Sequence, residues 1–172
     1  ICWNEDNQLS ADLMHIYIKN ETVDYMHGIG NGLMVKQDGA QEYNQMAGKE
    51  ILAYIRDEDV YLVDVQGNAE TVFYPVEDDG SYIGVNRTQS SFVKVYLQDR
   101  KIDYVLFTTS TTGVMIPLDQ ALPEETRLNG FFWAEDERPR QAADIFLHPE
   151  RTKRPETVAI SASAAEDEEE EE

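Results

Sequence analysis

The sequence has a single cysteine, few basic residues and no long apolar run. One cysteine, Cys2, excludes an internal disulfide and a zinc site built from several cysteines. No apolar stretch approaches the roughly 20 residues that a membrane-spanning helix needs. With neither cross-links nor such a segment, a hydrophobic core must hold the fold together. The chain has 172 residues, of which 41% are hydrophobic, and this is enough to form such a core.

Basic residues are scarce as well. The 14 lysines and arginines stand against 34 aspartates and glutamates, which gives a formal net charge of −20. Residues 151–172 hold eight acidic and three basic residues, a net of −5, so the preceding 150 residues carry −15. Such a body repels phosphate backbones and anionic membrane surfaces, which argues against a nucleic-acid partner. If the ligand is anionic, its apolar part must supply the affinity.

The sequence also lacks the local motifs of common enzymes. It contains no P-loop, no GxGxxG after a strand, no HExxH and no GxSxG. The glycine-rich stretch 28–32 leads into a strand pattern and not into a helix, which argues against a phosphate-binding loop. Residues 78–80, Asp-Asp-Gly, have a composition typical of a turn, which argues against a calcium site. His15 and His27 flank one expected hairpin without a third ligand in view, and His148 stands apart from both. We therefore predict a protein that is not an enzyme and has no catalytic residues, metal or cofactor.

What the sequence does contain is an internal repeat. Three segments align without gaps at offsets of 37 and then 42 residues: Met14–Val35, Ile51–Val72 and Val93–Val114. The matching positions include a tyrosine (Tyr17, Tyr54, Tyr96), a turn residue (Asn20, Asp57, Asp99), a corner pair (Gly30-Asn31, Gly67-Asn68, Thr109-Ser110) and an upstream asparagine (Asn44, Asn86).

Each repeat predicts a strand, a tight turn, a second strand, a corner and a third strand. Apolar residues alternate with mixed ones along the first strand, which is typical of a half-buried strand and not of a helix. A bend at the glycine-rich corner lets the sheet wrap around a core. We predict an all-β domain of three tandem repeats over residues 1–117. Residues 118–150 should form a short irregular or helical cap that packs on the sheet, with aromatics that are candidates for closing one end of it, and residues 151–172 should form a disordered acidic tail.

The apolar side of the strands is the candidate ligand-binding surface. A folded sheet with an open seam would expose it as a groove, and acyl chains would gain roughly 0.8 kcal/mol per buried methylene there. In a closed sandwich the same side chains would be an ordinary core. The groove candidates are Met14, Ile16, Ile18, Ile51, Ala53, Ile55, Val93, Val95, Leu97, Val35, Val72 and Val114.

Several segments carry a family resemblance. They are QMAGK followed by VYLVDVQGNAETVFYP, then IGVNRTQSSFVKVYLQDRKIDYVLF, MIPLDQ, Arg138-Pro139 and Asp144-Ile145-Phe146. Over about residues 8 to 148 the sequence resembles the OstA-like proteins of Bacteroidetes-type bacteria, which are related to the LptA/OstA family of lipopolysaccharide-transport proteins. The resemblance implies a twisted β-jelly-roll, or β-taco, with an interior groove for lipid A acyl chains. It also implies end-to-end stacking with other β-jelly-roll transport proteins in the periplasm or envelope of a Gram-negative bacterium.

Two interpretations of function remain open at this point. In the first, the chain is a non-enzymatic lipid-binding or relay module, whose groove holds lipopolysaccharide or another acylated lipid. In the second, it is a structural or protein-interaction domain with a self-filled core that pairs through its sheet edges. One departure from the resembling family bears on stacking, because a C-terminal cap and acidic tail would block that end. This suggests a terminal module.

Overall fold

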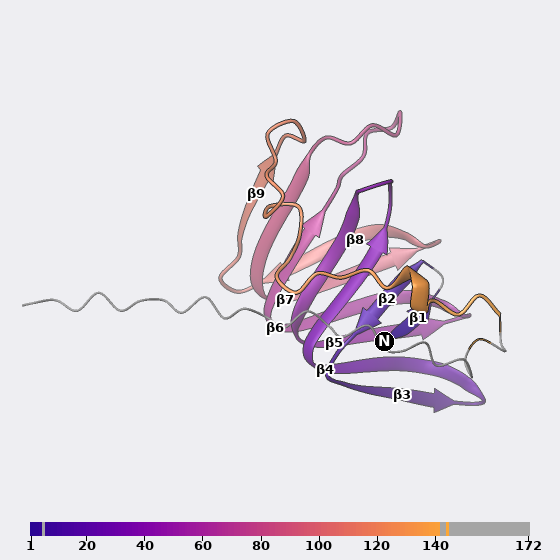
Figure 1. Cartoon of the computed structure of the whole chain (residues 1–172). Coiled ribbons are helices and arrows are strands. Elements are labelled where there is room, and N and C mark those ends of the chain that lie inside the picture. The colour runs from indigo at the N-terminus through magenta and orange to yellow at the C-terminus, as the bar shows by residue number, and fades with distance from the viewer. Residues whose placement is uncertain (5, 142–143, 145–172) are drawn as a thin grey trace, which may run out of the picture.

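In the computed structural model the described residues form one open antiparallel sheet of nine strands (Figure 1). The structure describes residues 1–4, 6–141 and 144. The predicted all-β twisted jelly roll, or β-taco, is confirmed. The elements are β1 (Cys2–Asn4), β2 (Asn7–Ser10), β3 (Leu13–Lys19), β4 (Thr22–Gln37), β5 (Tyr43–Arg56), β6 (Asp59–Phe73), β7 (Val85–Gln98), β8 (Lys101–Thr108), β9 (Thr112–Ile116) and a 3-10 turn, η1 (Glu135–Glu137).

Three long hairpins, one from each repeat, build the sheet. The second hairpin is β5–β6, with both strands unbroken. In the first hairpin, β2 and β3 follow one another along the chain and both pair with β4. In the third hairpin, β8 and β9 follow one another and both pair with β7. Antiparallel pairing of β4 with β5 and of β6 with β7 joins the hairpins. His148, Ile145-Phe146 and the predicted tail lie outside the described residues.

The hairpin tips share one local geometry. Asn20-Glu21, Asp57-Glu58 and Asp99-Arg100 all have positive φ angles, as two-residue turns of the primed type require. Next to each turn the register shifts by one residue, after Tyr17, Tyr54 and Tyr96 in turn. The same turn and bulge in all three copies confirm the repeat at the level of the backbone.

A second irregularity, at the corner pairs, folds the sheet. Gly30-Asn31, Gly67-Asn68 and Thr109-Ser110 have φ angles between 47° and 75°. Glycine adopts this left-handed region at little cost, and asparagine tolerates it better than most residues. The pairing register shifts beside the first two pairs, and β8 gives way to β9 at the third. Bulges bend strands. Aligned across the sheet, these form a crease along which it folds.

The crease divides the sheet into two leaves. Leaf 1 consists of β3, β8 and the halves of β4–β7 next to the hairpin tips. Leaf 2 consists of β1, β2, β9 and the other halves of β4–β7. In Figure 1 the hairpin tips project to one side and the loops between repeats stand at the top.

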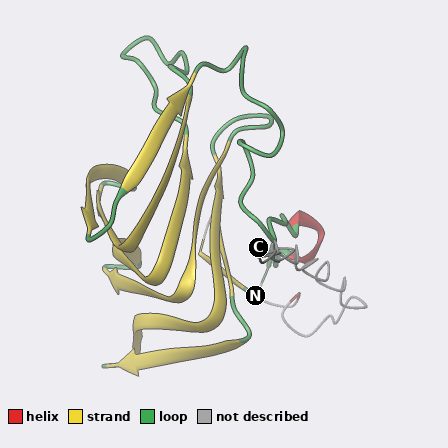
Figure 2. Ribbon diagram, turned by 90° about the vertical axis from the view of Figure 1, so that its left-hand side faces the viewer, coloured by secondary structure: helices red, strands yellow, loops and turns green. Residues whose placement is uncertain are grey.

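Two hydrophobic clusters hold this arrangement. The first lies between the leaves and includes Ile51, Val65 and Val93 from leaf 1 and Leu9 and Met34 from leaf 2. The second lies on the outer face of leaf 2 and is covered by residues 117–134, which we call the strap. Figure 2 shows the strap as a loop running along one side of the sheet. Leaf 2 is thus buried on both faces and leaf 1 on one.

The strap packs on the sheet, as we predicted for the cap, but on a face of the sheet and not at an end. Its aromatics were candidates for closing an end of the sheet. Phe131, Phe132 and Trp133 instead pack on the outer face of leaf 2, against the cluster that contains Leu33 and Val35. The physical reason is that leaf 2 carries apolar residues on both faces, so its outer face must also be removed from water.

Candidate functional site

The space between the leaves is filled at its centre. The side chains of Ile51, Val63, Val65 and Val93 are 0% exposed, and Ala53 beside them is equally buried. A close-packed interior of this kind has no room for a ligand. Any binding between the leaves must therefore take place toward an end of the fold.

An apolar slot lies between the leaves at the β8 end. Its volume is about 120 Å³, and no charged side chain is among the described residues that line it. β8 is the last strand of leaf 1 in the described sheet, so that no further strand covers this side. Leaf 1 contributes Val95, Ile102, Val105 and Phe107, and leaf 2 contributes Asn44, Gln45, Met46, Thr71, Val72, Phe73 and Asn86. Of the leaf 2 residues, Gln45 and Val72 turn their side chains to the outer face.

The structure brings together the first-strand candidates of the second and third repeats. Ile51, Ala53, Val93 and Val95 are buried in the cluster between the leaves, and Ile55 and Leu97 pack partly against it. Of these residues, Val95 lines the slot. The others fill the interior, as core residues do.

The first repeat behaves differently. Met14 packs partly against the inner cluster, whereas Ile16 is 51% and Ile18 is 70% exposed. The register places Ile16 opposite Met26, and so on the inner face of leaf 1. β3 is an edge strand, paired only with β4 in the described sheet, and this end of the inner face remains uncovered.

Three predicted groove residues lie away from the inner face. Val35 and Val72 are buried in the second cluster, under the strap, and Val114 is 51% exposed. Their inward-facing neighbours are Met34 and Thr71, one residue earlier in each case. We predicted that these valines face inward because they are apolar. Because the strap covers the outer face of leaf 2, apolar side chains such as Val35 and Val72 are buried on that face as well.

Three polar side chains on that outer face anchor the strap, and the sequence reasoning missed them. Gln8, Gln45 and Arg87 lie in one cross-strand row, alternating with Val35 and Val72. They occupy equivalent positions at the same offsets of 37 and 42 residues. Each anchor directly follows an asparagine at an equivalent position, Asn7, Asn44 or Asn86, so extending the repeat alignment back to these asparagines would have found them.

Each anchor makes hydrogen bonds to the strap's backbone. The Gln8 amide, 0% exposed, donates to the Phe132 carbonyl oxygen at 3.0 Å and accepts from the Ala134 N–H at 2.7 Å. The Gln45 amide, 1% exposed, donates to the carbonyl oxygen of Thr126 and accepts from the N–H of Leu128.

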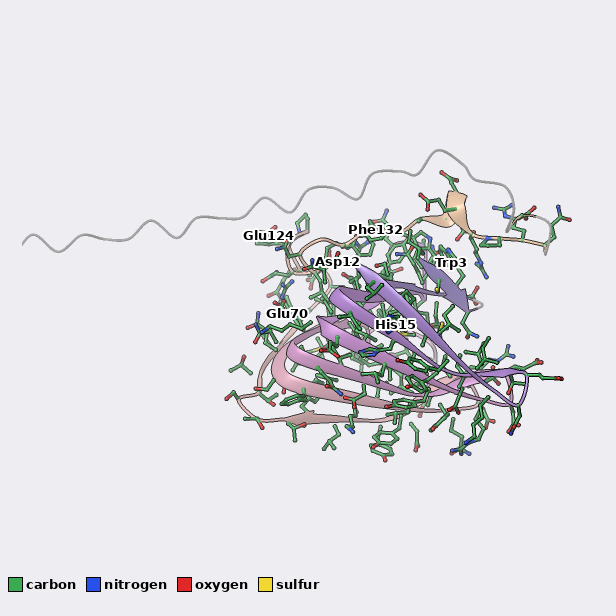
Figure 3. All side chains as sticks on the ribbon, turned by 90° about the horizontal axis from the view of Figure 1, so that it is seen from below. Trp3, Asp12, His15, Glu70, Glu124 and Phe132 are labelled. Carbon is green, nitrogen blue, oxygen red and sulfur yellow. The ribbon has the colours of Figure 1, made fainter. Side chains whose placement is uncertain are left out.

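Arg87 anchors the other part of the strap. Its guanidinium donates to the carbonyl oxygens of Glu124 at 2.8 Å and Arg127 at 3.0 Å, and pairs with Glu70. Figure 3 shows Glu70 and Glu124 toward one end of the strap and Phe132 and Trp3 toward the other. The strap is thus fixed along its length by side chains from three strands.

The outer face of leaf 1 carries tyrosines in cross-strand pairs. Tyr17 and Tyr25 stack with ring centroids 4.2 Å apart, and Tyr96 and Tyr104 stack at 4.3 Å. In each pair the two ring faces contact each other and the two hydroxyl groups hydrogen-bond. Loss of surrounding water raises the pKa of Tyr25 and of Tyr104, and the stacked partner raises it further.

The described residues hold no candidate metal centre. His27 bonds Glu50 at 2.8 Å, but the described part of the chain has no cluster of three histidine, cysteine or acidic side chains able to hold a metal ion. Burial raises the pKa of the Cys2 thiol, which disfavours the thiolate. Among the described residues there is also no helix with the length and apolarity needed to cross a membrane.

Comparisons with known proteins add no assignment: no family model matches the chain, and no curated protein does.

Proposed function

We propose that the chain is a non-enzymatic module that binds an acylated lipid, with an acyl chain held in the slot at the β8 end. The resemblance to OstA-like proteins extends the proposal to lipopolysaccharide and to the periplasm or envelope of a Gram-negative bacterium. The observation that carries it is the slot itself, an apolar space between leaves that are otherwise tightly packed.

The chemistry of the slot suits a hydrocarbon chain. Val95, Ile102, Val105 and Phe107 form one wall without a polar side chain, and each buried methylene contributes roughly 0.8 kcal/mol. Apolar cavities of roughly 150 Å³ take up small hydrocarbons such as benzene. A volume of about 120 Å³ therefore accommodates a short stretch of one chain, with the remainder passing out beside β8.

A displacement assay tests this proposal. A long-chain fatty acid bearing a fluorophore is titrated into the full chain, and lipopolysaccharide is added as competitor. We expect saturable binding that lipopolysaccharide reverses. Val105→Trp should fill the slot and abolish binding, whereas Leu106→Trp, on the opposite face of β8, should bind like the wild type. Circular dichroism checks that both variants fold. Absence of saturable binding to the wild type, or undiminished binding by folded Val105→Trp, would contradict the proposal.

The uncovered edges of leaf 1 favour a second role, pairing with another β-jelly-roll protein. β3 and β8 each have one edge without a partner strand in the described sheet. Ile18 on β3 and Tyr104 and Leu106 on β8 are exposed apolar side chains beside these edges. Backbone groups at such an edge can pair with a strand of another molecule. Sedimentation of the Tyr104→Lys, Leu106→Lys double variant tests it, because lysine on an edge strand opposes pairing. Association through the β8 edge should be lost, and undiminished association of the folded variant would contradict this role.

A further inference from the structure

The outer face of leaf 1 is a broad apolar surface. Its outward side chains form three cross-strand rows from β3 to β8. The row nearest the hairpin tips consists of Tyr17, Tyr25, Tyr54, Leu62, Tyr96 and Tyr104. The other rows begin at His15, which is labelled in Figure 3, and at Leu13. Of the outward residues in the three rows only Asp64 is buried, while Leu13 is 51%, Phe92 44% and Leu106 46% exposed.

The polar side chains of this face are bonded to one another. Within each stacked tyrosine pair the two hydroxyl groups hydrogen-bond. Lys94 Nζ lies 3.2 Å from Asp64 Oδ2, and His27 Nε2 lies 2.8 Å from Glu50 Oε2. A polar group that keeps its partner costs much less to remove from water than one without a partner. The face can therefore be covered without breaking its hydrogen bonds.

The face is close to neutral, although the chain has a net charge of −20. Lys94 offsets Asp64, and the His27–Glu50 pair contributes at most one negative charge. A basic partner would gain nothing here, and the acidic chain repels nucleic acid. The stacked tyrosines cover each other's ring faces, which bases would need for stacking. The surface suits a partner that is itself apolar and uncharged.

The face is also symmetric about its centre, which lies between β5 and β6. One stacked tyrosine pair lies on β3 and β4, and the other lies on β7 and β8. A half-turn about an axis parallel to the strands would place each pair of one copy over the other pair of a second copy. Such self-complementarity is what an isologous dimer requires.

The area of the face is sufficient for a dimer. Six strands about 4.8 Å apart and three rows about 6.8 Å apart cover roughly 600 Å². Two such faces would bury about 1,200 Å² in total, which is at the lower end of the range for specific interfaces. We propose that two copies of the chain pack face to face through the outer faces of their first leaves. This goes beyond lipid binding, since the slot lies on the other side of leaf 1.

Sedimentation velocity of the full chain from micromolar to millimolar concentration tests the dimer. The Leu52→Glu, Leu62→Glu double variant places two charges on the central strands of the face, away from the β3 and β8 edges. Gln89→Glu with Val114→Glu adds the same charges at exposed positions on the outer face of leaf 2. Phe92→Glu, at a position that is 44% exposed, is a second face variant that spares the core. Circular dichroism checks the fold of each protein.

We expect the wild type and the leaf 2 control to dimerise, and both face variants to raise the dimer Kd by more than tenfold. Added salt should strengthen the dimer, because it screens the repulsion between two acidic chains. Hydrogen exchange of the β8 amides should not change with concentration, whereas pairing through the β8 edge would protect them. A wild type that stays monomeric at millimolar concentration, or dimers that persist in the folded face variants, would overturn the proposal.

Discussion

Leaf 1 and leaf 2 are halves of the same bent strands, yet they are buried differently. Leaf 2 packs against the inner cluster on one face and the strap on the other, with Gln8, Gln45 and Arg87 bonded to the strap's backbone. Leaf 1 shares the inner cluster, while its outer face carries exposed tyrosines and its edges are uncovered.

The difference assigns separate roles to the two leaves. A sheet covered on both faces gains more from apolar burial than one covered on a single face. Leaf 2 is thus the more extensively buried leaf, and leaf 1 the leaf whose last strand, β8, leaves the slot open. The Val95, Ile102 and Phe107 wall of the slot belongs to leaf 1, whereas Met46 and Phe73 belong to leaf 2. A ligand would bridge the more extensively buried leaf and the less covered one.

The largest expected effect comes from the centre of the fold. Ile51→Ala opens a cavity at a site that is 0% exposed, and should lower the free energy of unfolding by roughly 2–5 kcal/mol. Ile18→Ala, the same substitution at a 70% exposed position of leaf 1, should change it by less than about 0.5 kcal/mol. Urea denaturation measures both. Similar losses in the two variants would mean that the β3 end of leaf 1 is covered in solution.

A smaller but substantial loss is expected when the strap is released from leaf 2. Gln45→Ala leaves the buried Leu128 N–H without its partner and removes one of the donors to the Thr126 carbonyl, which Arg127 and Tyr74 still reach. This should cost roughly 1–3 kcal/mol. Gln89→Ala, at an exposed position on the same face of leaf 2, should be close to neutral. Faster hydrogen exchange of the Leu128 amide in the first variant, and not in the second, would localise the effect. Unchanged hydrogen exchange of the Leu128 amide would contradict the role of Gln45 in holding the strap on leaf 2.

The tyrosine pairs of leaf 1 should contribute less. A double-mutant cycle with Tyr17→Leu and Tyr25→Leu should give a coupling free energy of roughly 0.5–1.5 kcal/mol, because the two rings stack at 4.2 Å. Tyr17 and Tyr96, which lie on β3 and β7, should show no coupling in the same measurement. Equal coupling in both cycles would point to an effect on the unfolded chain.

The smallest expected effect is the part of the alkaline pH dependence that comes from leaf 1; burial also raises the pKa of Tyr82 and of Cys2, which lie outside this leaf. The pKa values of Tyr25 and Tyr104 are raised above 10.0 in the fold, so folding favours their neutral forms. That contribution is complete below the unfolded pKa and is lost as the pH rises through the folded values. Phenolate absorbance should therefore titrate later in the folded chain than in urea. In the Tyr25→Phe, Tyr104→Phe double variant, stability should fall less with alkaline pH; an unchanged fall would contradict this origin.

Much of the fold could be predicted because it is local and repeated. Alternation at period two, primed turns such as Asn20-Glu21 and the Gly30-Asn31 corner are all written in short stretches of sequence. The side on which Val35 and Val72 lie was predicted wrongly, because both faces of leaf 2 are apolar and alternation no longer marks the interior. The anchor Gln45 was missed since a buried glutamine looks like any surface one until its partner, the strap, is placed.

The extent of the slot could not be predicted for a different reason. Equivalent residues of the three repeats have the same neighbours along the chain but not across the sheet. Ile16 and Val95 occupy equivalent positions, and the first is 51% exposed while the second is 4% exposed. Whether a position is filled, open or slot-lining depends on where its repeat lies in the sheet.

The most direct test of lipid binding in the slot uses a photo-crosslinker. Benzoylphenylalanine is placed at Ile102, which is 38% exposed and lines the slot, or at Ile18, 70% exposed at the other edge of leaf 1. Each protein is irradiated with lipopolysaccharide, and the adducts are identified by mass spectrometry. We expect acyl-chain adducts at position 102 and few or none at position 18. Equal labelling at both positions, or adducts at 102 that join the crosslinker only to other residues of the chain, would contradict the account.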